Sequence, residues 1–483
     1  MRHITRPFLA LASLAILALY GAGGCAVGPD YAQPKTVTPD TFKEAAPDAG
    51  QNTDWKVAEP GAVDAAPWWT VFEDPVLNAF MPQLAMANPD VATARANLRQ
   101  ARAAVREATA SFFPTITGGG EVSRGQTGEM AVRNAYSARL SASWELDLFG
   151  GARRGAESAF AEAEGSEAEL AAMLLAMRAE LAQNYFQLRS LDEQVALYEQ
   201  TIAAYEKSLE ITQNQHKAGI VTRLDVAQAE TQLKNARAAA IGLDLERRQT
   251  EHAIASLLGL PPALLAIKPG NLDARLPRIE APLPATLLER RPDIAAAERR
   301  MAAANARIGV AKSAYFPVFS LTGSGSYSGD AFREWFTLPN RIWSVGANLA
   351  QTLFQGGRLL AQTDRAVAGW ESSVASYRGT VLTAFREVED QLAATALLER
   401  EETMQLDALA SARDAENLAL SQYRGGIVTY LTVVNAQATA LASARTAATL
   451  KGRRFVAAVA LIRSLGGGWG PAPYVQPEGT DQP

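Results

Sequence analysis

The feature that most constrains this chain is an internal duplication, because the second half of its 483 residues repeats the plan of the first. Four segments recur in the same order at an offset that grows slightly from about 203 positions. They are Asn88–Val91 with Arg291–Ile294, Ser111–Pro114 with Ala314–Pro317, Asp147–Arg153 with Leu353–Arg358, and Ala218–Thr222 with Gly425–Thr429. Four landmarks in one order indicate two copies of one structural unit, so each element should occur twice.

Each copy predicts one long helix and two shorter ones. The first copy predicts Asp90–Phe113, Ala152–Lys217 and Leu224–Leu260, and the second predicts Asp293–Phe316, Arg358–Arg424 and Leu431–Leu465. The long helix would span roughly 100 Å, and the two shorter helices laid end to end would span roughly 95 Å. These matched lengths predict an antiparallel wall of helices, with one continuous helix beside a stacked pair. Helical patterns this long are typical of coiled-coil-like packing rather than of a globule.

Two strands are predicted between the first short helix and the long helix of each copy. Apolar and polar residues alternate along Tyr136–Leu148, and again along Phe319–Tyr327 and Trp343–Ala350. The segments Gly125–Asn134 and Gly329–Asn340 are interpreted as polar turns between the strands. This pattern favours membrane strands with an apolar face toward lipid. A half-buried sheet in a soluble protein has the same period and stays an alternative.

Four strands per chain cannot close a barrel, and an open sheet edge is not tolerated in hydrocarbon. Two chains would supply eight strands and a filled lumen, whereas three would supply twelve, the smallest of these numbers that leaves an aqueous pore. The predicted fold class is therefore mainly α with a transmembrane β-barrel contribution. Duplicated long-helix hairpins would form an α-barrel, and four β-strands per protomer would form a trimeric 12-stranded barrel. Trp144, Trp343 and Tyr327 are candidates for an interfacial aromatic girdle, with ordinary packing as the alternative.

The N-terminus predicts export and a lipid anchor. Arg2 and Arg6 precede an apolar run, Phe8–Tyr20, that is too short to span a bilayer, so residues 1–24 are interpreted as a signal peptide. Small residues then precede Cys25, the only cysteine, in a segment that resembles a lipobox. Lipidation of this thiol, for example by palmitate, is expected, and a small-residue cleavage site with a chance cysteine is the alternative. Ala26 in place of an aspartate predicts sorting to the outer membrane of a Gram-negative bacterium.

Composition and motifs offer no catalytic chemistry. The three histidines are not spaced with cysteines or carboxylates as metal ligands are, and neither a phosphate-binding loop nor a nucleophile motif occurs. The net charge of −5 is opposite in sign to the positive charge that is typical of nucleic-acid-binding proteins. We therefore expect no enzyme activity, no cofactor, no metal and no nucleic-acid partner. A purely structural periplasmic coiled-coil protein is the alternative to a channel.

Two groups of motifs resemble the TolC-type outer-membrane factor family, specifically its lipoprotein branch in multidrug efflux systems. The first group is Cys25–Tyr31, Trp68–Trp69 with Phe72, Asp74, Pro75 and Leu77, and Asn88–Asp90; the second is Arg290–Ile294, Glu298, Ala303–Asn305, Ile308–Gly309 and Phe316–Pro317. The resemblance runs from Cys25 to about residue 468. It implies a homotrimer with a twelve-stranded barrel, a helical periplasmic tunnel and a mixed equatorial collar.

The resemblance also implies roles for the two helix-to-helix turns. The glycines alone are explained by helix termination, but the apolar pair Ile-Val is not. In the family, such periplasmic tips resemble contact points for an adaptor protein. The candidate tip residues are Gly219, Ile220, Val221 and Thr222 in the first copy, and Gly426, Ile427, Val428 and Thr429 in the second.

The segment around the second turn resembles the region that closes the tunnel at rest. The candidate gate residues are Tyr423, Arg424, Leu431 and Asn435. Leu431 and Asn435 match a leucine and an aspartate whose rings constrict the tunnel in the family. Asn435 departs from the acidic pattern, which puts a cation-sensitive gate in doubt. A pair one turn apart at a helix interface is the alternative reading.

The function implied is a passive trimeric duct in a tripartite efflux system. It would carry drugs or small molecules from an inner-membrane resistance-nodulation-division pump and a periplasmic adaptor across the outer membrane, with membrane lipid around the anchor. The alternative is the outer component of a type I protein secretion system. The expected division is 1–24 signal peptide, 25–88 anchored segment and part of the equatorial domain, 89–260 first repeat, 261–290 equatorial linker, 291–466 second repeat, and 467–483 tail.

Overall fold

The computed structural model describes residues 26–34, 38–44, 67–126, 132–277, 279, 284, 287, 290–333 and 335–467. The predicted signal peptide, Cys25 and most of the C-terminal tail lie outside the described residues. Contacts divide the chain into two compact units. One unit comprises residues 1–36, 96–167 and 296–379, and the other comprises residues 37–95, 168–295 and 380–483.

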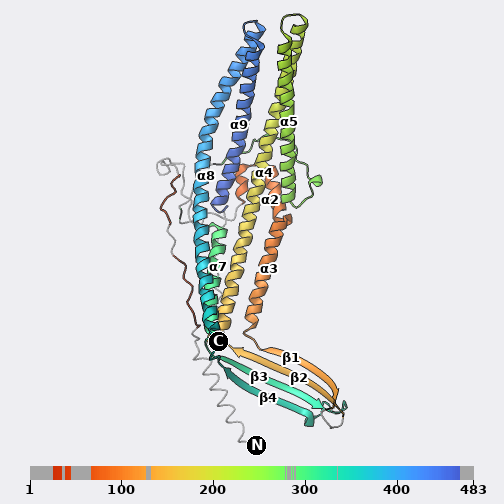
Figure 1. Cartoon of the computed structure of the whole chain (residues 1–483), viewed down its shortest axis with the longest axis vertical. Helices are drawn as coiled ribbons and strands as arrows, with labels where there is room; N and C mark the ends of the chain where they lie inside the picture. Colours follow the sequence, from red (N-terminus) through yellow and green to blue (C-terminus); the bar gives the residue numbers. More distant parts are fainter. Residues whose placement is uncertain are drawn as a thin grey trace. The chain divides into compact units, whose positions relative to one another are not determined.

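The two copies form the same series of helices (Figure 1). The first copy contains α3 (Pro89–Ala110), α4 (Gly151–Lys217) and α5 (Arg223–Leu257), and the second contains α7 (Pro292–Ser313), α8 (Arg358–Arg424) and α9 (Tyr430–Ser464). Corresponding helices have equal lengths of 22, 67 and 35 residues. The predicted helices are thus confirmed, although α3, α5 and α7 each end three residues before their predicted ends. After α3 and α7 a tight turn precedes Pro114 and Pro317, because a residue before proline avoids helical geometry.

In both copies, a hydrogen bond connects the end of the last helix with the start of the first helix. Asn88, which caps α3, donates its Nδ2 to the carbonyl of Leu257 at 2.9 Å. At the equivalent place Arg291 donates its Nη1 to the carbonyl of Ser464 at 3.0 Å. These contacts place the two shorter helices of each copy end to end, as their summed lengths predict.

Two glycines make these junctions possible. Gly259 and Gly466 have φ angles of +69° and +92°, and each lies directly against the carbonyl of a residue near the start of the short helix, Ala87 or Arg290. A side chain at either glycine would collide with that backbone oxygen, and the left-handed conformation itself favours glycine. The two copies therefore share the need for a glycine at this junction as well as their helix lengths.

The four strands form one antiparallel sheet in the order β1-β2-β3-β4 (Figure 1). They are β1 (Thr115–Gly125), β2 (Arg133–Leu146), β3 (Val318–Gly329) and β4 (Arg341–Ala350). Pairing of β2 with β3 joins the hairpins of the two copies. The predicted number of strands and their alternation are confirmed.

The register gathers most of the large apolar residues of the four strands on one face. Trp144 is paired with Leu321, which is paired with Ala347, and Ile116 is paired with Ala142. The opposite face is mainly polar, with Val318 and Ile342 as exceptions, and includes Ser324 and Ser344, whose hydroxyl oxygens lie 2.9 Å apart. Every residue of β4 is exposed in the described chain, whereas several apolar residues of β2 and β3, including Trp144 and Leu321, are half-buried.

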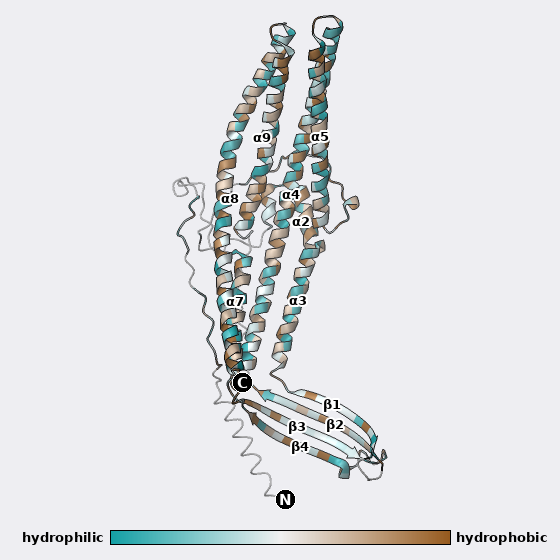
Figure 2. Cartoon of the chain, viewed as in Figure 1, coloured by the Kyte–Doolittle hydropathy of each residue, from teal (hydrophilic) through white to brown (hydrophobic). Residues whose placement is uncertain are grey.

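The helices show mixed hydropathy along their lengths (Figure 2). In the described part of the chain, no helix combines the length and the apolar character needed to cross a membrane.

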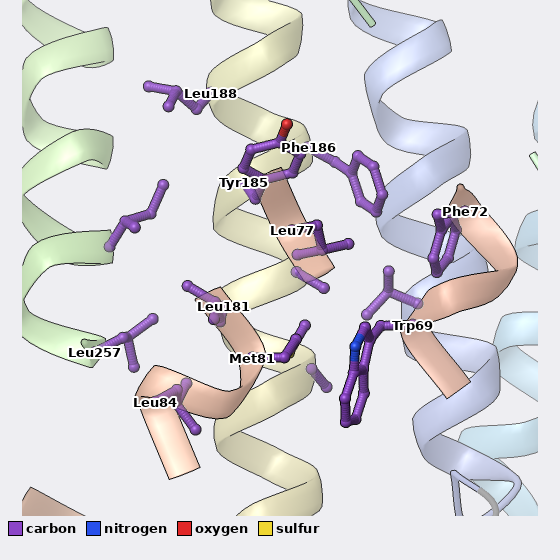
Figure 3. Packing of buried hydrophobic residues seen from close by; sticks show 14 of the residues in the cluster. Trp69, Phe72, Leu77, Met81, Leu84, Leu181, Tyr185, Phe186, Leu188 and Leu257 are labelled. Atoms are coloured by element: carbon purple, nitrogen blue, oxygen red, sulfur yellow. The ribbon is translucent and has the colours of Figure 1, made fainter. Parts of the chain in front are cut away.

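The largest core lies where a short N-terminal helix packs on α4. This helix, α2 (Pro75–Ala87), follows the 3-10 turn η1 (Trp68–Phe72) and begins at Asp74, whose carboxylate accepts from two backbone N–H groups at 2.9 Å. Leu77, Met81 and Leu84 are fully buried and lie against side chains of α4, as Figure 3 shows. Burial of each such side chain stabilises the fold by about 1.5–3 kcal/mol.

Candidate functional site

Both helix-to-helix tips use the same terminating motif. Gly219 and Gly426 have φ angles of +72° and +73°, as the left-handed residue of such a turn requires. The two pairs of backbone bonds match: Gly219 N to His216 O at 2.9 Å and Ile220 N to Gln215 O at 2.9 Å, then Gly426 N to Tyr423 O at 3.0 Å and Ile427 N to Gln422 O at 2.9 Å. The glycines are thereby explained by backbone geometry alone.

The isoleucines at the tips have no such explanation. Ile220 and Ile427 are 71% and 75% exposed. Val221 and Val428 are half-buried, and Thr222 and Thr429 are exposed. One exposed apolar side chain is common on a protein surface, but its recurrence at equivalent positions of both tips favours a contact surface. The adaptor role of these tips stays a prediction.

The start of the following helix differs between the two tips. Thr222 and Asp225 form a capping box: the Asp225 carboxylate accepts from the Thr222 N–H at 2.8 Å, and the Asp225 N–H donates to the Thr222 hydroxyl at 3.4 Å. At the second tip, Thr429 makes no side-chain cap bond, and Thr432 stands where the carboxylate of a capping box would be. The α9 start is therefore less well secured than the α5 start.

The candidate gate residues lie in two different environments. Leu431 and Asn435 are exposed on one face of α9, one turn apart, while Tyr430 and Val433 are buried on another. Tyr423 lies elsewhere: its hydroxyl donates to Gln215 Oε1 on α4 at 2.7 Å, and its ring packs on Tyr430. Burial raises the pKa of both tyrosines, so their hydroxyls stay protonated.

Arg424 is exposed beside the second turn, where α8 ends. Since Leu431 and Asn435 are both exposed, they are not an interface pair within the protomer. The structure places them where a second chain or solvent can reach them. Whether they close a tunnel stays a prediction.

Two of the three girdle candidates, Tyr327 and Trp343, are diagonal neighbours on β3 and β4, whereas Trp144 lies apart from them. Trp144 lies near the helix-proximal end of the sheet, where its Nε1 donates to the carbonyl of Phe112 at 2.9 Å. Tyr327 lies toward the other end and packs on Phe336, with ring centroids 5.4 Å apart. Trp343 projects from β4 and is 69% exposed. The sheet therefore carries aromatic side chains near both ends of its strands.

The turn predicted at Gly329–Asn340 lies between β3 and β4 as expected, but its predicted polar character was wrong. Phe332, Trp335 and Phe336 lie in this segment and form ring contacts with Tyr136 and Tyr327 on the neighbouring strands. The sequence signal for this cluster was present as three aromatic residues within five positions.

The residue predicted to carry lipid, Cys25, lies outside the described residues, but the segment that follows it is tied to both copies. Ala26 lies against Gly150 at the turn between β2 and α4, and the Val27 N–H donates to the Phe149 carbonyl at 3.1 Å. On the other copy, Asn305 donates its Nδ2 to the Pro29 carbonyl at 2.9 Å.

Charged groups secure the same segment. Asp30 accepts from the buried Arg154 at 2.7 Å, and the Tyr31 hydroxyl bonds to Glu298. Burial, together with the bond to Glu298, raises the pKa of Tyr31, which therefore stays protonated. Sequence reasoning identified these residues as motifs but did not pair them with one another.

A model of the family described as outer membrane efflux protein matches residues 81–260 and 283–467, which are the greater part of the chain. The chain belongs to this family.

Curated relatives of this outer membrane efflux protein match along nearly the whole chain. A probable efflux pump outer membrane protein of Pseudomonas putida, TtgC, is 34% identical over 478 residues, which are 96% of each chain. The pyoverdine export outer membrane protein OpmQ of Pseudomonas aeruginosa is 34% identical over 431 residues, which are 86% of this chain and 90% of that one.

Solved structures agree with the fold. The outer-membrane channel OprN is 31% identical with a TM-score of 0.84, covering 92% of this chain and 100% of that one. CusC is 28% identical with a TM-score of 0.81, covering 91% and 99%. This outer membrane efflux protein is therefore a channel component of the outer membrane that extends into the periplasm, and a transport protein rather than an enzyme.

Proposed function

We propose that three copies of this efflux protein assemble into one duct, with their sheets joined into a twelve-stranded barrel and their helices forming a tunnel. The observation that carries the proposal is the sheet itself. In the described chain, β1 and β4 each pair on one side only, and the sheet has one apolar face. Unpaired backbone groups cannot lie in hydrocarbon, so β4 of one copy must pair with β1 of the next.

The test is an inter-chain disulfide between these two edges. Within one sheet, β1 and β4 are three strand spacings apart, roughly 14 Å, whereas disulfide formation needs Cα atoms within about 7 Å. Any bond must therefore join two chains. Thr117→Cys is combined in turn with Ser344→Cys, Gly346→Cys or Asn348→Cys, which share its face of the sheet.

At least one pair should give disulfide-linked dimers and trimers on a non-reducing gel after extraction from outer membranes. The single variants, which retain Cys25, are the matched controls and should stay monomeric on that gel. Monomers from every pair would refute the shared barrel.

The tips Gly219–Thr222 and Gly426–Thr429 are proposed as the contacts for a periplasmic adaptor protein. Their matched backbone geometry and the exposed Ile220 and Ile427 support this role. A trimer would present six similar tips in a ring.

Leu431 and Asn435 are proposed to narrow the duct, with Tyr423 and Arg424 beside them. The bond from Tyr423 to Gln215 joins the second hairpin to the first, so it would restrain the second hairpin at rest. Three asparagines would form a neutral ring, which does not attract cations as three carboxylates would. Single-channel conductance should rise in Leu431→Ala but not in Leu224→Ala, the exposed equivalent on α5. Equal conductance in wild type and Leu431→Ala would place the gate elsewhere.

Cys25 is proposed to carry a lipid that anchors the chain to the outer membrane. Its neighbour Ala26 packs at the β2–α4 turn, so the anchor would leave the protein beside the end of the sheet. Mass spectrometry should detect acyl chains on the wild type and none on Cys25→Ser, whose trimers should persist in part.

The cargo is proposed to be drugs or other small molecules, delivered by an inner-membrane resistance-nodulation-division pump. The names of the relatives support this, since they refer to antibiotics, toluene and pyoverdine as exported compounds of those proteins. Export of a protein through a type I system is the alternative. A neighbouring gene for an ATP-driven exporter with a secreted protein would favour it.

The division into two repeats at 89–260 and 291–466 is supported by the two stretches that match the family model.

A further inference from the structure

The face of α9 that carries Leu431 and Asn435 continues along the helix. Positions three or four residues apart share one side of a helix. On this face follow Ala438, Ala442, Arg445, Thr449 and Arg453. The two arginines are exposed, about 12 Å apart at 1.5 Å per residue. The side proposed to face the duct therefore changes from neutral near the tip to cationic farther along.

These two arginines differ from Arg454, the next residue along the helix, in having no ion-pair partner in the described part of the chain. Arg454 pairs with Glu399 and Glu402 on α8. In the part of the chain that the structure describes, no ion pair or hydrogen bond engages the guanidinium group of Arg445 or Arg453. Both groups therefore keep their full capacity to bind an anion.

The two arginines also line a groove of about 680 Å³ between the hairpins. Tyr198 and Tyr205 of α4 form part of its wall, and Glu401 is the one acid among its lining residues. Two guanidinium groups against one carboxylate leave the groove with a positive excess. Its volume lies within the range of sites for small organic molecules.

Comparison of the two copies shows that the helical wall does not need these charges. At the positions of α5 equivalent to Arg445 and Arg453 the chain has Ala238 and Glu246. The α5 helix has the same length and packs in an equivalent hairpin. The positive charge is therefore a property of the second copy and not of the architecture.

We propose that Arg445 and Arg453 form a cargo site that favours small organic anions with an aromatic body. A carboxylate or sulfonate would accept bidentate bonds from a guanidinium group, and the aromatic part would lie against Tyr198 and Tyr205. The proposal rests on the trimeric duct proposed above, in which three such grooves bring six guanidinium groups to the passage. Low-dielectric walls would raise the local concentration of anions at this level.

The test compares two dyes that share one ring system, the anion fluorescein and the cation rhodamine 6G, by fluorescence anisotropy on detergent-solubilised trimer. The double variant Arg445→Gln with Arg453→Gln should bind fluorescein about tenfold more weakly, as expected for the loss of charge-assisted hydrogen bonds. Rhodamine binding should not weaken. Arg248→Gln is the matched control, because Arg248 is an exposed α5 arginine outside the groove, and its Kd for fluorescein should equal that of the wild type.

Trimer formation is checked first on an unheated gel. Absence of trimers would refute the proposed duct, whereas the binding measurements on trimers test the cargo site. If trimers form, equal fluorescein Kd in wild type and double variant overturns the cargo site. Absence of fluorescein binding to wild-type trimer overturns it too. As a second measurement, planar-bilayer reversal potentials in a KCl gradient should move toward K⁺ selectivity in the double variant, and an unchanged potential would count against the site.

Discussion

At the scale of single residues, equivalent positions of the two copies perform the same task with different chemistry. Asn88 reaches the last turn of α5 with a neutral amide, whereas Arg291 reaches the last turn of α9 with a guanidinium group. Arg291 is buried and also donates to Asp293 and Glu387, at 2.7 and 2.8 Å. These carboxylates raise the pKa of Arg291 against the opposing effect of burial.

Arg291→Met should therefore be strongly destabilising. The substitution leaves Glu387 and the Ser464 carbonyl without their donor, and breaking a buried ion pair costs about 3 kcal/mol or more. Arg237→Met removes an exposed arginine from its pair with Glu206 and should cost less than about 1 kcal/mol. The measurement is denaturant unfolding in detergent, followed by far-ultraviolet circular dichroism. Equal losses in the two variants would contradict the assignment of Arg291 to the junction.

Glu416 on α8 makes stability depend on pH. Burial raises the pKa of this carboxyl above its ordinary value, against the lowering effects of Arg413 and Gln437. The folded state therefore binds the proton more tightly than the unfolded state. The resulting stability is present below the ordinary pKa of glutamate and is lost as the pH rises through the raised value.

Glu416→Gln should thus have a higher Tm than the wild type at neutral pH, and the difference should shrink on acidification to below the ordinary glutamate pKa. Comparing variant and wild type at each pH removes the effects of other titrating groups. A difference that is constant with pH, or of opposite sign, would show that Glu416 is not penalised by burial.

At the scale of elements, the two helical hairpins are equal in length but not in how their second helix begins. The α5 start has the Thr222–Asp225 capping box, and the α9 start has no side-chain cap. A missing cap costs about 1 kcal/mol of helix stability. The second hairpin, which also carries the candidate gate, is therefore the one whose tip opens more readily.

Hydrogen exchange should find this asymmetry and its reversal. In the wild type, amides at the start of α9 should exchange faster than those at the start of α5. Asp225→Ala should accelerate exchange at the first tip by roughly fivefold, and Thr432→Asp, which completes the box with Thr429, should slow it at the second by a similar factor. Unequal tips in a double variant carrying both changes, with the original order retained, would refute capping as the cause.

At the scale of the whole molecule, the proposed duct needs contacts beyond one chain at both its sheet and its tips. The strands expose an apolar face, and the tips expose Ile220 and Ile427. Loss of the first contact should prevent assembly, whereas loss of the second should leave the trimer intact and interrupt transport. The two kinds of defect can therefore be separated.

The double variant Ile220→Asp with Ile427→Asp should lower export severalfold without lowering the amount of trimer, because a charge at an apolar contact must be desolvated on binding. Drug susceptibility of cells and trimer on an unheated gel are the two measurements. Leu264→Asp, a change at a 73% exposed leucine away from the tips, is the control and should preserve both. Normal export by the double variant would exclude the tips as adaptor contacts.

The sequence by itself determined the elements of this protein. Helix lengths, the alternation of the strands and their number follow from periodic patterns, and the duplication supplied an internal check on each. The exposed tip isoleucines and the gate positions on α9 could also be located, since a helix boundary and a spacing of four residues are local properties. Their roles follow from resemblance and stay proposals.

Only the tertiary structure decided which distant residues meet. The junctions of Asn88 with Leu257 and of Arg291 with Ser464, the segment around Asp30 and Tyr31, and the groove beside Arg445 join residues far apart in sequence without any period. Such contacts depend on how the helices pack against one another. Several side chains of similar type could bond to each partner, and only the packing decides which of them does. The aromatic cluster at Phe332 was missed for the same reason, because its packing against two strands exists only once the sheet has formed.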